Sequence, residues 1–430
     1  MIGNKIYALA KELFPINRSI TGSGVRKSLK ILQKINKDLK IKGIPSGTKV
    51  FDWIIPQEWN VDEAWIKDSK NRKIIDFKNN NLHLMGYSLS VSKKITLKDL
   101  KKNLYSIKDK PNAIPYVTSY YKKKWGFCLS FNLLKNLKED IYEVKIKSKF
   151  KKGFLNYGEL IIPGKTKKEI LLSTYICHPS MANNELSGPC VAIHLSKWIK
   201  SMKNRNYSYR IVFVPETIGS IAYLSKNYKK MIKNTVAGFN LTCLGDDRAY
   251  SYLPSRQENS LSDVIAKHVL KWTFKDYKSY SWLEKGSDER QYCSPGIDLP
   301  VATIMRTKYG EYPEYHTSDD NLINVVTPKG LQGGYEIIKK AITAIEMNCN
   351  PLMKIKCEPM LSKYGLYPTY NNNDQSISSD LKDFKLIDFL SYCDGKRSLL
   401  EIAEKCKLPI WTLYPYLEIL LKKKIISKKK

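Results

Sequence analysis

Five polar clusters in this sequence carry residue types that bind metal ions or transfer protons. They contain His178, Glu216, Thr242, Asp288 and His316. The first three clusters each follow an apolar run of the kind that forms a buried strand. Active sites in open α/β sheets lie at the carboxyl ends of strands, so these clusters stand where an active site is expected. Imidazole and carboxylate groups at such a place can bind a metal ion or act as acid and base.

The elements that would position these clusters alternate between strand and helix from residue 168 to residue 350. The predicted strands are Glu169–Thr174, Arg210–Val214, Val236–Leu244 and Leu299–Met305, and the predicted helices are Cys190–Met202, Ile218–Asn227 and Pro328–Met347. Continuous apolar strands separated by helices indicate a sheet covered on both faces. We therefore predict an α/β fold with a three-layer core.

The core domain is predicted to comprise residues 1–45, which include two helices, and residues 161–350. Between them, residues 46–160 contain short β-rich runs and few long amphipathic stretches, which predicts an inserted α+β domain. The strands expected in this part of the chain are Val50–Ile55, Leu82–Leu89, Tyr142–Ile146 and Phe154–Ile162.

The last part of the chain is predicted to form a linker, residues 351–380, and a winged helix, residues 381–430. Three short helices and a final strand-like run support the winged helix. The region from Pro409 to Glu418 is apolar and nearly uncharged. This composition favours packing against a protein partner or the same chain over contact with a phosphate backbone.

The net charge of +32, from 73 Lys and Arg against 41 Asp and Glu, would suit an anionic partner. The lysines are scattered rather than clustered, which is typical of a solvated surface. The nine cysteines include no CxxC pair, so neither a disulfide framework nor a zinc ribbon is expected. No signal-peptide pattern and no apolar stretch of about 20 residues is present. We expect a cytoplasmic protein that binds neither membrane nor nucleic acid.

The clusters, in this order, resemble the zinc aminopeptidase superfamily, which also includes glutaminyl cyclase. More narrowly, a bacterial subfamily of aminopeptidase-like proteins is similar in the phrases ICHPSMANNELSG, PETIGSIAYL, GSDERQYCSPGIDLP and MRTKYGEYPEYHTSDDNL. The resemblance implies a zinc-aminopeptidase-like, phosphorylase/hydrolase-type core, an inserted domain of unknown function and a C-terminal winged helix. Such proteins are often encoded among genes for surface-polysaccharide biosynthesis.

The same resemblance implies roles for individual residues. His178 matches the first metal-binding histidine of the family and His316 the last. Asn184, four residues before Gly188, matches the aspartate that bridges two zinc ions in typical members. Glu216 matches the glutamate that acts as general base on the attacking water.

Three departures from the family pattern concern the metal. Asn184 is neutral where a carboxylate is usual, and Thr217 and Thr242 replace metal-binding carboxylates. Because zinc prefers nitrogen, sulfur and carboxylate ligands, we predict one zinc ion, held by His178, Asn184 and His316, rather than two. Glu185 or Asp288 could substitute for the weaker amide ligand.

The candidate substrate-binding residues are charged side chains within or near the clusters. They are Asp288, Glu289, Arg290, Arg306 and Arg18. Guanidinium groups bind carboxylates and phosphates with two hydrogen bonds, so the arginines could hold an anionic group of a small-molecule or peptide substrate. The alternative for Asp288, Glu289 and Arg290 is an ordinary ion-paired loop.

Two functions from different classes follow. The first is a metal-dependent hydrolase of an aminoacyl or N-acyl amide, in which Glu216 moves the proton. The second is a binding or assembly protein whose peptidase fold has decayed and whose winged helix recruits a partner. A DNA-binding regulator would rest only on the net charge and the winged helix.

Overall fold

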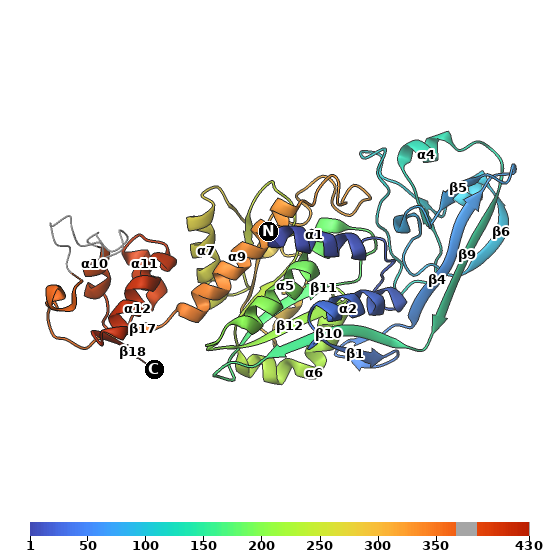
Figure 1. Cartoon of the computed structure of the whole chain (residues 1–430). Helices are drawn as coiled ribbons and strands as arrows, with labels where there is room; N and C mark the ends of the chain where they lie inside the picture. The colour runs from blue at the N-terminus through green and yellow to red at the C-terminus, as the bar shows by residue number, and fades with distance from the viewer. Residues whose placement is uncertain (367–384, 430) are drawn as a thin grey trace. The chain divides into compact units, whose positions relative to one another are not determined.

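A computed structural model describes residues 1–366 and 385–429 of the chain (Figure 1). Residues 367–384 and 430 lie outside the described part, and with them part of the predicted linker and the start of the predicted winged-helix segment. The chain divides into two compact units. The first comprises residues 1–264 and 276–337, and the second comprises residues 265–275 and 338–430.

An eight-stranded sheet forms the centre of the first unit, in the order β1-β10-β12-β11-β13-β16-β14-β15. Its four middle strands are parallel. The strands are β1 (Lys40–Pro45), β10 (Phe154–Ile162), β11 (Glu169–Tyr175), β12 (Ser208–Val214), β13 (Thr235–Asn240), β14 (Ser251–Leu253), β15 (Lys278–Ser279) and β16 (Val301–Met305). β11 and β12 are buried along their whole length, as their apolar sequences predicted.

Helices pack against this sheet. α5 (Ser187–Ser201) contacts α1 (Ile2–Leu13), α2 (Ser23–Ile35) and β11, and α6 (Ile218–Asn234) contacts β10 and β12. In Figure 1, α1, α2 and α5 lie on one side of the sheet and α6 on the other. α8 (Glu289–Tyr292) is a single short turn of helix. The predicted α/β architecture is confirmed.

The amino end of α5 approaches the ends of the strands unusually closely. A Cβ atom on Gly188 would lie 2.2 Å from the Leu241 carbonyl oxygen and 2.4 Å from Thr174 Oγ1. Only glycine permits this approach. Gly188 thereby places the turn before α5, which carries Asn184, directly over the end of the sheet.

The inserted region is built on a four-stranded sheet in the order β5-β4-β9-β6. Its elements are β4 (Glu58–Lys67), β5 (Lys73–Asp76), β6 (Val91–Thr96), α3 (Leu97–Lys101), β7 (Leu104–Tyr105), β8 (Phe127–Cys128), α4 (Phe131–Asn136) and β9 (Ile141–Lys151). β10 continues from β9 into the large sheet, where it pairs with β12. The segment limits proposed from the sequence stay predictions.

Two predicted strands of the inserted region are wrong. The run Leu82–Leu89 is not a strand. It begins within a short 3-10 helix (Asn81–His83), which the Asn80 side chain caps by accepting a hydrogen bond from the Leu82 amide. Further along the run, Tyr87 has a positive φ of 64°, which does not occur in a regular strand. Leu82 and Tyr87 are nevertheless buried, which explains the apolar pattern. The run Val50–Ile55 is split into β2 (Lys49–Val50) and β3 (Trp53–Ile54), which form a hairpin around Phe51 at φ 54°.

The second unit contains three short helices and a strand pair. They are α10 (Lys385–Ser391), α11 (Leu399–Lys405), α12 (Tyr414–Lys422), β17 (Asn350–Met353) and β18 (Ile426–Lys429). α7 (Leu261–Thr273) and α9 (Pro328–Met347) each run from one unit into the other. Among the apolar residues at 410–420, Ile410, Leu413 and Leu417 are fully buried. Burial within the chain therefore accounts for the apolar character of this region.

Within the described residues, no helix is long and apolar enough to cross a membrane.

Candidate metal centre

The strand ends bring two predicted site residues, His178 and Glu216, together. His178 follows β11 and Glu216 follows the neighbouring strand β12, and His178 Nε2 lies 3.6 Å from Glu216 Oε2. His316 comes from the long loop after β16, and its ring centroid lies 5.6 Å from that of His178. Of the four side chains that the sequence singled out for metal binding and catalysis, His178 therefore lies beside two, Glu216 and His316.

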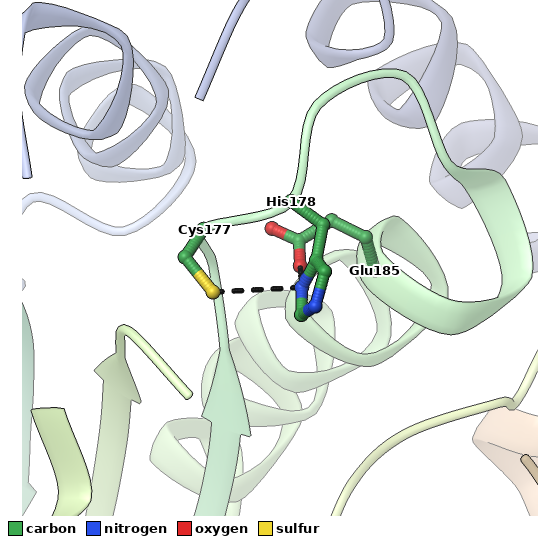
Figure 2. Close-up of side chains that lie close together, drawn as sticks. All are labelled: Cys177, His178 and Glu185. Carbon is green, nitrogen blue, oxygen red and sulfur yellow. Dashed lines mark hydrogen bonds and ion pairs between the residues drawn. The ribbon is translucent and has the colours of Figure 1, made fainter. Parts of the chain in front are cut away.

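One nitrogen of His178 is already occupied. Its Nδ1 lies 2.8 Å from Glu185 Oε2, and both residues are buried (Figure 2). A carboxylate can only accept, so Nδ1 carries the proton and donates it to Glu185. Burial lowers the pKa of His178, but the neighbouring Cys177 and Glu185 outweigh it and raise that pKa well above its usual value, so Nε2 also carries a proton. A metal ion at Nε2, the nitrogen nearer to Glu216, would displace that proton. A carboxylate behind the ring in this way is the usual support of a metal-binding histidine.

Cys177, His178 and Glu185 form a compact trio of possible ligands, but their geometry argues against a metal among them. Cys177 Sγ, at 3.5 Å, and Glu185 both approach Nδ1, while the other ring nitrogen points away (Figure 2). Cys177 Sγ also accepts a hydrogen bond from the Glu216 amide at 3.3 Å. Burial raises the pKa of the Cys177 thiol to about 11, so it keeps its proton at neutral pH. The trio supports His178 and holds the start of the Glu216 loop.

His316 is a second available imidazole. Its Nε2 is buried without a hydrogen-bond partner in the described structure. Burial, and then the neighbouring His178, lower the pKa of His316 to about 3, so its ring is neutral and has a free lone pair. A buried polar atom without a partner is costly, and a metal ion would relieve that cost.

Asn184 lies in the turn that precedes α5, an irregular stretch at Ala182–Leu186. Its amide, and that of Asn183, donate to the carboxylate of Asp320 at 2.9 and 2.7 Å. The Asn184 side-chain nitrogen is buried without a partner. Asp320 thus ties the Asn184 turn to the loop that carries His316.

Glu216 lies at the amino end of α6 with its carboxylate turned toward His178. Ser287 Oγ donates to Glu216 Oε1 at 3.0 Å. Burial raises the pKa of Glu216, and His178 opposes this shift. A carboxylate with a raised pKa can accept a proton and later return it near neutral pH.

Thr217 and Thr242, which the resemblance aligned with two further metal-binding carboxylates, make hydrogen bonds within the protein. Thr217 has a positive φ of 63°, its amide donates to Asp288 Oδ1 at 2.8 Å, and its Oγ1 accepts from Arg290 at 2.8 Å. Thr242 Oγ1 lies 2.6 Å from the hydroxyl of Tyr175. Both threonine hydroxyls are engaged within the protein, so neither adds a charged ligand.

The charged residues proposed for substrate binding lie in different surroundings. Arg18 is buried, donates to the His178 carbonyl oxygen at 3.0 Å and lies 3.4 Å from Glu185. Glu289 is buried, and its carboxylate accepts hydrogen bonds from Asn240 and Tyr309. Arg290 is exposed.

Asp288 and Arg306 complete the proposed set. Asp288 is buried behind the Glu216 loop, where Oδ1 accepts from the Thr217 amide and from Ser220 Oγ. Arg306 is buried with its guanidinium 3.9 Å from the ring centroid of Tyr250. Among the five residues, Arg290 is the one that solvent reaches freely.

Comparison with known proteins places the chain in a family. Residues 7–348 match the family described as a domain of unknown function, DUF4910. The chain belongs to the DUF4910 family. Residues 350–428 match a family of winged helix-turn-helix domains, which confirms the predicted C-terminal winged helix.

Two relatives from Clostridium acetobutylicum align with nearly the whole of this protein. One, named as a candidate polysaccharide biosynthesis protein with an aminopeptidase-like domain, is 45% identical over 408 residues, 94% of this chain and 91% of that protein. The other is the crystal structure of a candidate peptidase, 42% identical with a TM-score of 0.93, covering 100% of this chain and 97% of that one.

A more distant neighbour is a zinc aminopeptidase from Bacillus subtilis, with 15% identity, a TM-score of 0.59, and coverage of 80% of this chain and 94% of that one. At this identity the likeness concerns the fold. The DUF4910 chain therefore has an aminopeptidase-like fold, as its sequence phrases predicted.

Several residues that shape the site were missed by the sequence reasoning. Asp320 and Ser287 lie within the sequence runs that resemble the bacterial subfamily, but no role was predicted for them. Glu185 was predicted only as a substitute metal ligand. Tyr116 comes from the inserted region, 62 residues before His178 in the sequence, yet its ring centroid lies 4.9 Å from that of His178. No local pattern around Tyr116 indicated this contact.

Replacing Asp288 with asparagine is expected to stabilise the protein increasingly as the pH rises. Burial, and then repulsion from Glu216, raise the pKa of Asp288 to about 8. The protonated carboxyl group stabilises the folded protein. This contribution is fully present below the pKa that the group has in the unfolded chain, about 3.9, and it is lost as the pH rises through 8. Asparagine keeps an oxygen for the Thr217 amide but cannot ionise.

Urea unfolding at about pH 5 and about pH 8.5 measures this effect. The free energy of unfolding of Asp288→Asn, relative to wild type, should rise by at least about 1 kcal/mol between the two pH values. A constant difference between the two proteins would contradict the assignment of the raised pKa.

Proposed function

We propose that this protein is a metal-dependent hydrolase of an aminoacyl or N-acyl amide, with one divalent ion, zinc in the first instance, held by His178, His316 and Asn184. The observation that carries the proposal is the orientation of His178. Its Nδ1–H is fixed by Glu185, which directs Nε2 toward Glu216, and its ring lies beside that of His316. The unpartnered Nε2 of His316 supports the same ligand set, in which Asn184 would offer its side-chain oxygen.

A divalent ion bound there would activate water and polarise the scissile carbonyl group. Glu216 would take a proton from the water that attacks the carbonyl carbon. The carbon–nitrogen bond then breaks, and Glu216 returns the proton to the leaving amine. Ser287, by donating to one oxygen of Glu216, leaves the other oxygen directed toward His178.

The charged residues take new roles in this proposal. Arg18 and Glu289 hold the loops of the site rather than the substrate, because both are buried and hydrogen-bonded within the protein. Arg290 is placed to meet an anionic group of the substrate, because it is exposed and its guanidinium is anchored on Thr217 beside Glu216. The name of the C. acetobutylicum relative suggests a substrate from polysaccharide biosynthesis. A cytoplasmic location stays a prediction.

Metal analysis of the purified protein tests the proposal. We expect about one equivalent of zinc in the wild type and loss of that zinc in both His178→Ala and His316→Ala. Activity is measured on a panel of aminoacyl nitroanilides and N-acetylated amino sugars, with and without a chelator. Absence of bound zinc after incubation with the metal would refute the proposal.

The second candidate function is a binding or assembly protein without turnover. It is favoured by Thr217 and Thr242, whose hydroxyls are engaged in hydrogen bonds with Arg290 and Tyr175 instead of offering charged ligands. A protein that binds zinc but hydrolyses no amide in the panel would support this function. Turnover that is lost with Glu216 would exclude it.

A further inference from the structure

A segment of the inserted region, residues 114–120, runs beside the loop that carries His316. The Tyr116 amide donates to the His316 carbonyl oxygen at 2.9 Å, and the Ser318 amide donates to the Ile114 carbonyl oxygen at 2.9 Å. Between these bonds, Pro115 and Thr317 form an antiparallel bridge. The segment thus holds the backbone from the His316 carbonyl group to Ser318.

The side chain of Tyr116 also contacts both candidate metal-binding histidines. Its ring centroid lies 4.9 Å from that of His178 and 5.3 Å from that of His316. The Tyr116 hydroxyl is hydrogen-bonded to that of Tyr120 at 2.8 Å, which holds the ring in place. On the His316 ring, Tyr315 adds a stacked contact at 3.9 Å.

The His316 backbone needs such support. Its φ is 55°, in the left-handed region, where a residue with a side chain is strained. A conformation of this kind persists only where the surroundings impose it. A turn bond within the loop, from the Thr317 amide to the Glu314 carbonyl oxygen, and the bonds from the 114–120 segment to His316 and Ser318 together hold this conformation.

We propose that the 114–120 segment is a positioning element for His316, so that the metal centre is complete only when the inserted region is docked on the core. The proposal rests on the metal centre of the proposed function. The inserted region is then a part of the site rather than an appendage. Partners that orient a metal ligand typically change metal affinity by about tenfold to a hundredfold, and we assign Tyr116 that role.

Zinc affinity, measured by competition with a chromophoric chelator, tests the proposal. Tyr116→Ala removes the ring and is expected to weaken zinc binding by at least about tenfold. Tyr116→Phe keeps the ring contacts with both histidines and loses only the bond to Tyr120, so it should keep most of the wild-type affinity for zinc. Tyr121→Ala is the matched control, because Tyr121 follows the segment but is 54% exposed. Equal affinities in Tyr116→Ala and the wild type would overturn the proposal.

Hydrogen exchange at the Ser318 amide gives a measurement that needs no metal. In Tyr116→Ala, exchange at Ser318 should be at least about tenfold faster, because its bond to Ile114 depends on the docked segment. If the wild type binds no zinc, the proposed function fails, and the positioning of the loop is judged by this exchange alone. Unchanged exchange would overturn it.

Discussion

Replacing Glu216 with glutamine is expected to lower kcat by about a hundredfold to ten-thousandfold. The carboxylate lies 3.6 Å from His178 Nε2, and one of its oxygens accepts a hydrogen bond from Ser287. Glutamine has nearly the same shape but cannot accept a proton from water, so general base catalysis is lost. The measurement is steady-state kinetics on the best amide substrate of the panel.

The same variant should still bind zinc with an affinity within about threefold of the wild type, because Glu216 is not one of the proposed ligands. Glu284→Gln is a suitable control, since Glu284 is an exposed carboxylate whose hydrogen bond is to the Ser281 amide at the start of a short helix. Loss of zinc from Glu216→Gln would make Glu216 a ligand and would require a different base. Unchanged kcat would remove Glu216 from catalysis.

Glutamine at position 185 is expected to weaken zinc binding by about tenfold to a hundredfold. Glu185 holds the Nδ1–H of His178 and so directs Nε2 toward Glu216, where a metal ion would displace its proton. A glutamine amide can instead donate to Nδ1, which favours the ring form whose proton lies on Nε2. The negative charge that makes the imidazole a stronger ligand is also lost.

Cys177→Ser provides the matched control, because it distinguishes the two possible metal positions. If the ion sat among Cys177, His178 and Glu185, the serine variant would lose zinc as severely as the Glu185 variant. In the arrangement proposed here, Cys177 is not a ligand: it accepts a hydrogen bond from the Glu216 amide and lies 3.5 Å from His178 Nδ1, and a serine hydroxyl can make both contacts. The serine variant should therefore retain zinc within about threefold, and a larger loss would move the metal to the Nδ1 side.

Much of the core was predictable because its signals are local. The core elements β11, β12 and α9 were predictable because the apolar or polar character of each side chain indicates directly whether it is buried. Where local chemistry competes, prediction failed. The apolar residues at 82–89 are buried, but the Asn80 cap and the left-handed Tyr87 bend the chain out of a strand.

The site was predictable only in part, for a physical reason. His178, Glu216 and His316 stand out because imidazole and carboxylate groups near strand ends are chemically conspicuous. Their supports are ordinary residues whose roles depend on contacts between distant segments. Tyr116 contacts His316 although it lies 200 positions earlier in the sequence, and no sequence pattern near Tyr116 indicates that contact.

The carboxylate of Asp320 has a consequence for the way the site is lost on heating. It accepts the amides of Asn183 and Asn184 while lying four residues after His316. Neither the Asn184 turn nor the His316 loop can open without breaking these hydrogen bonds to Asp320. The two loops therefore melt together, as one cooperative unit, instead of fraying in turn.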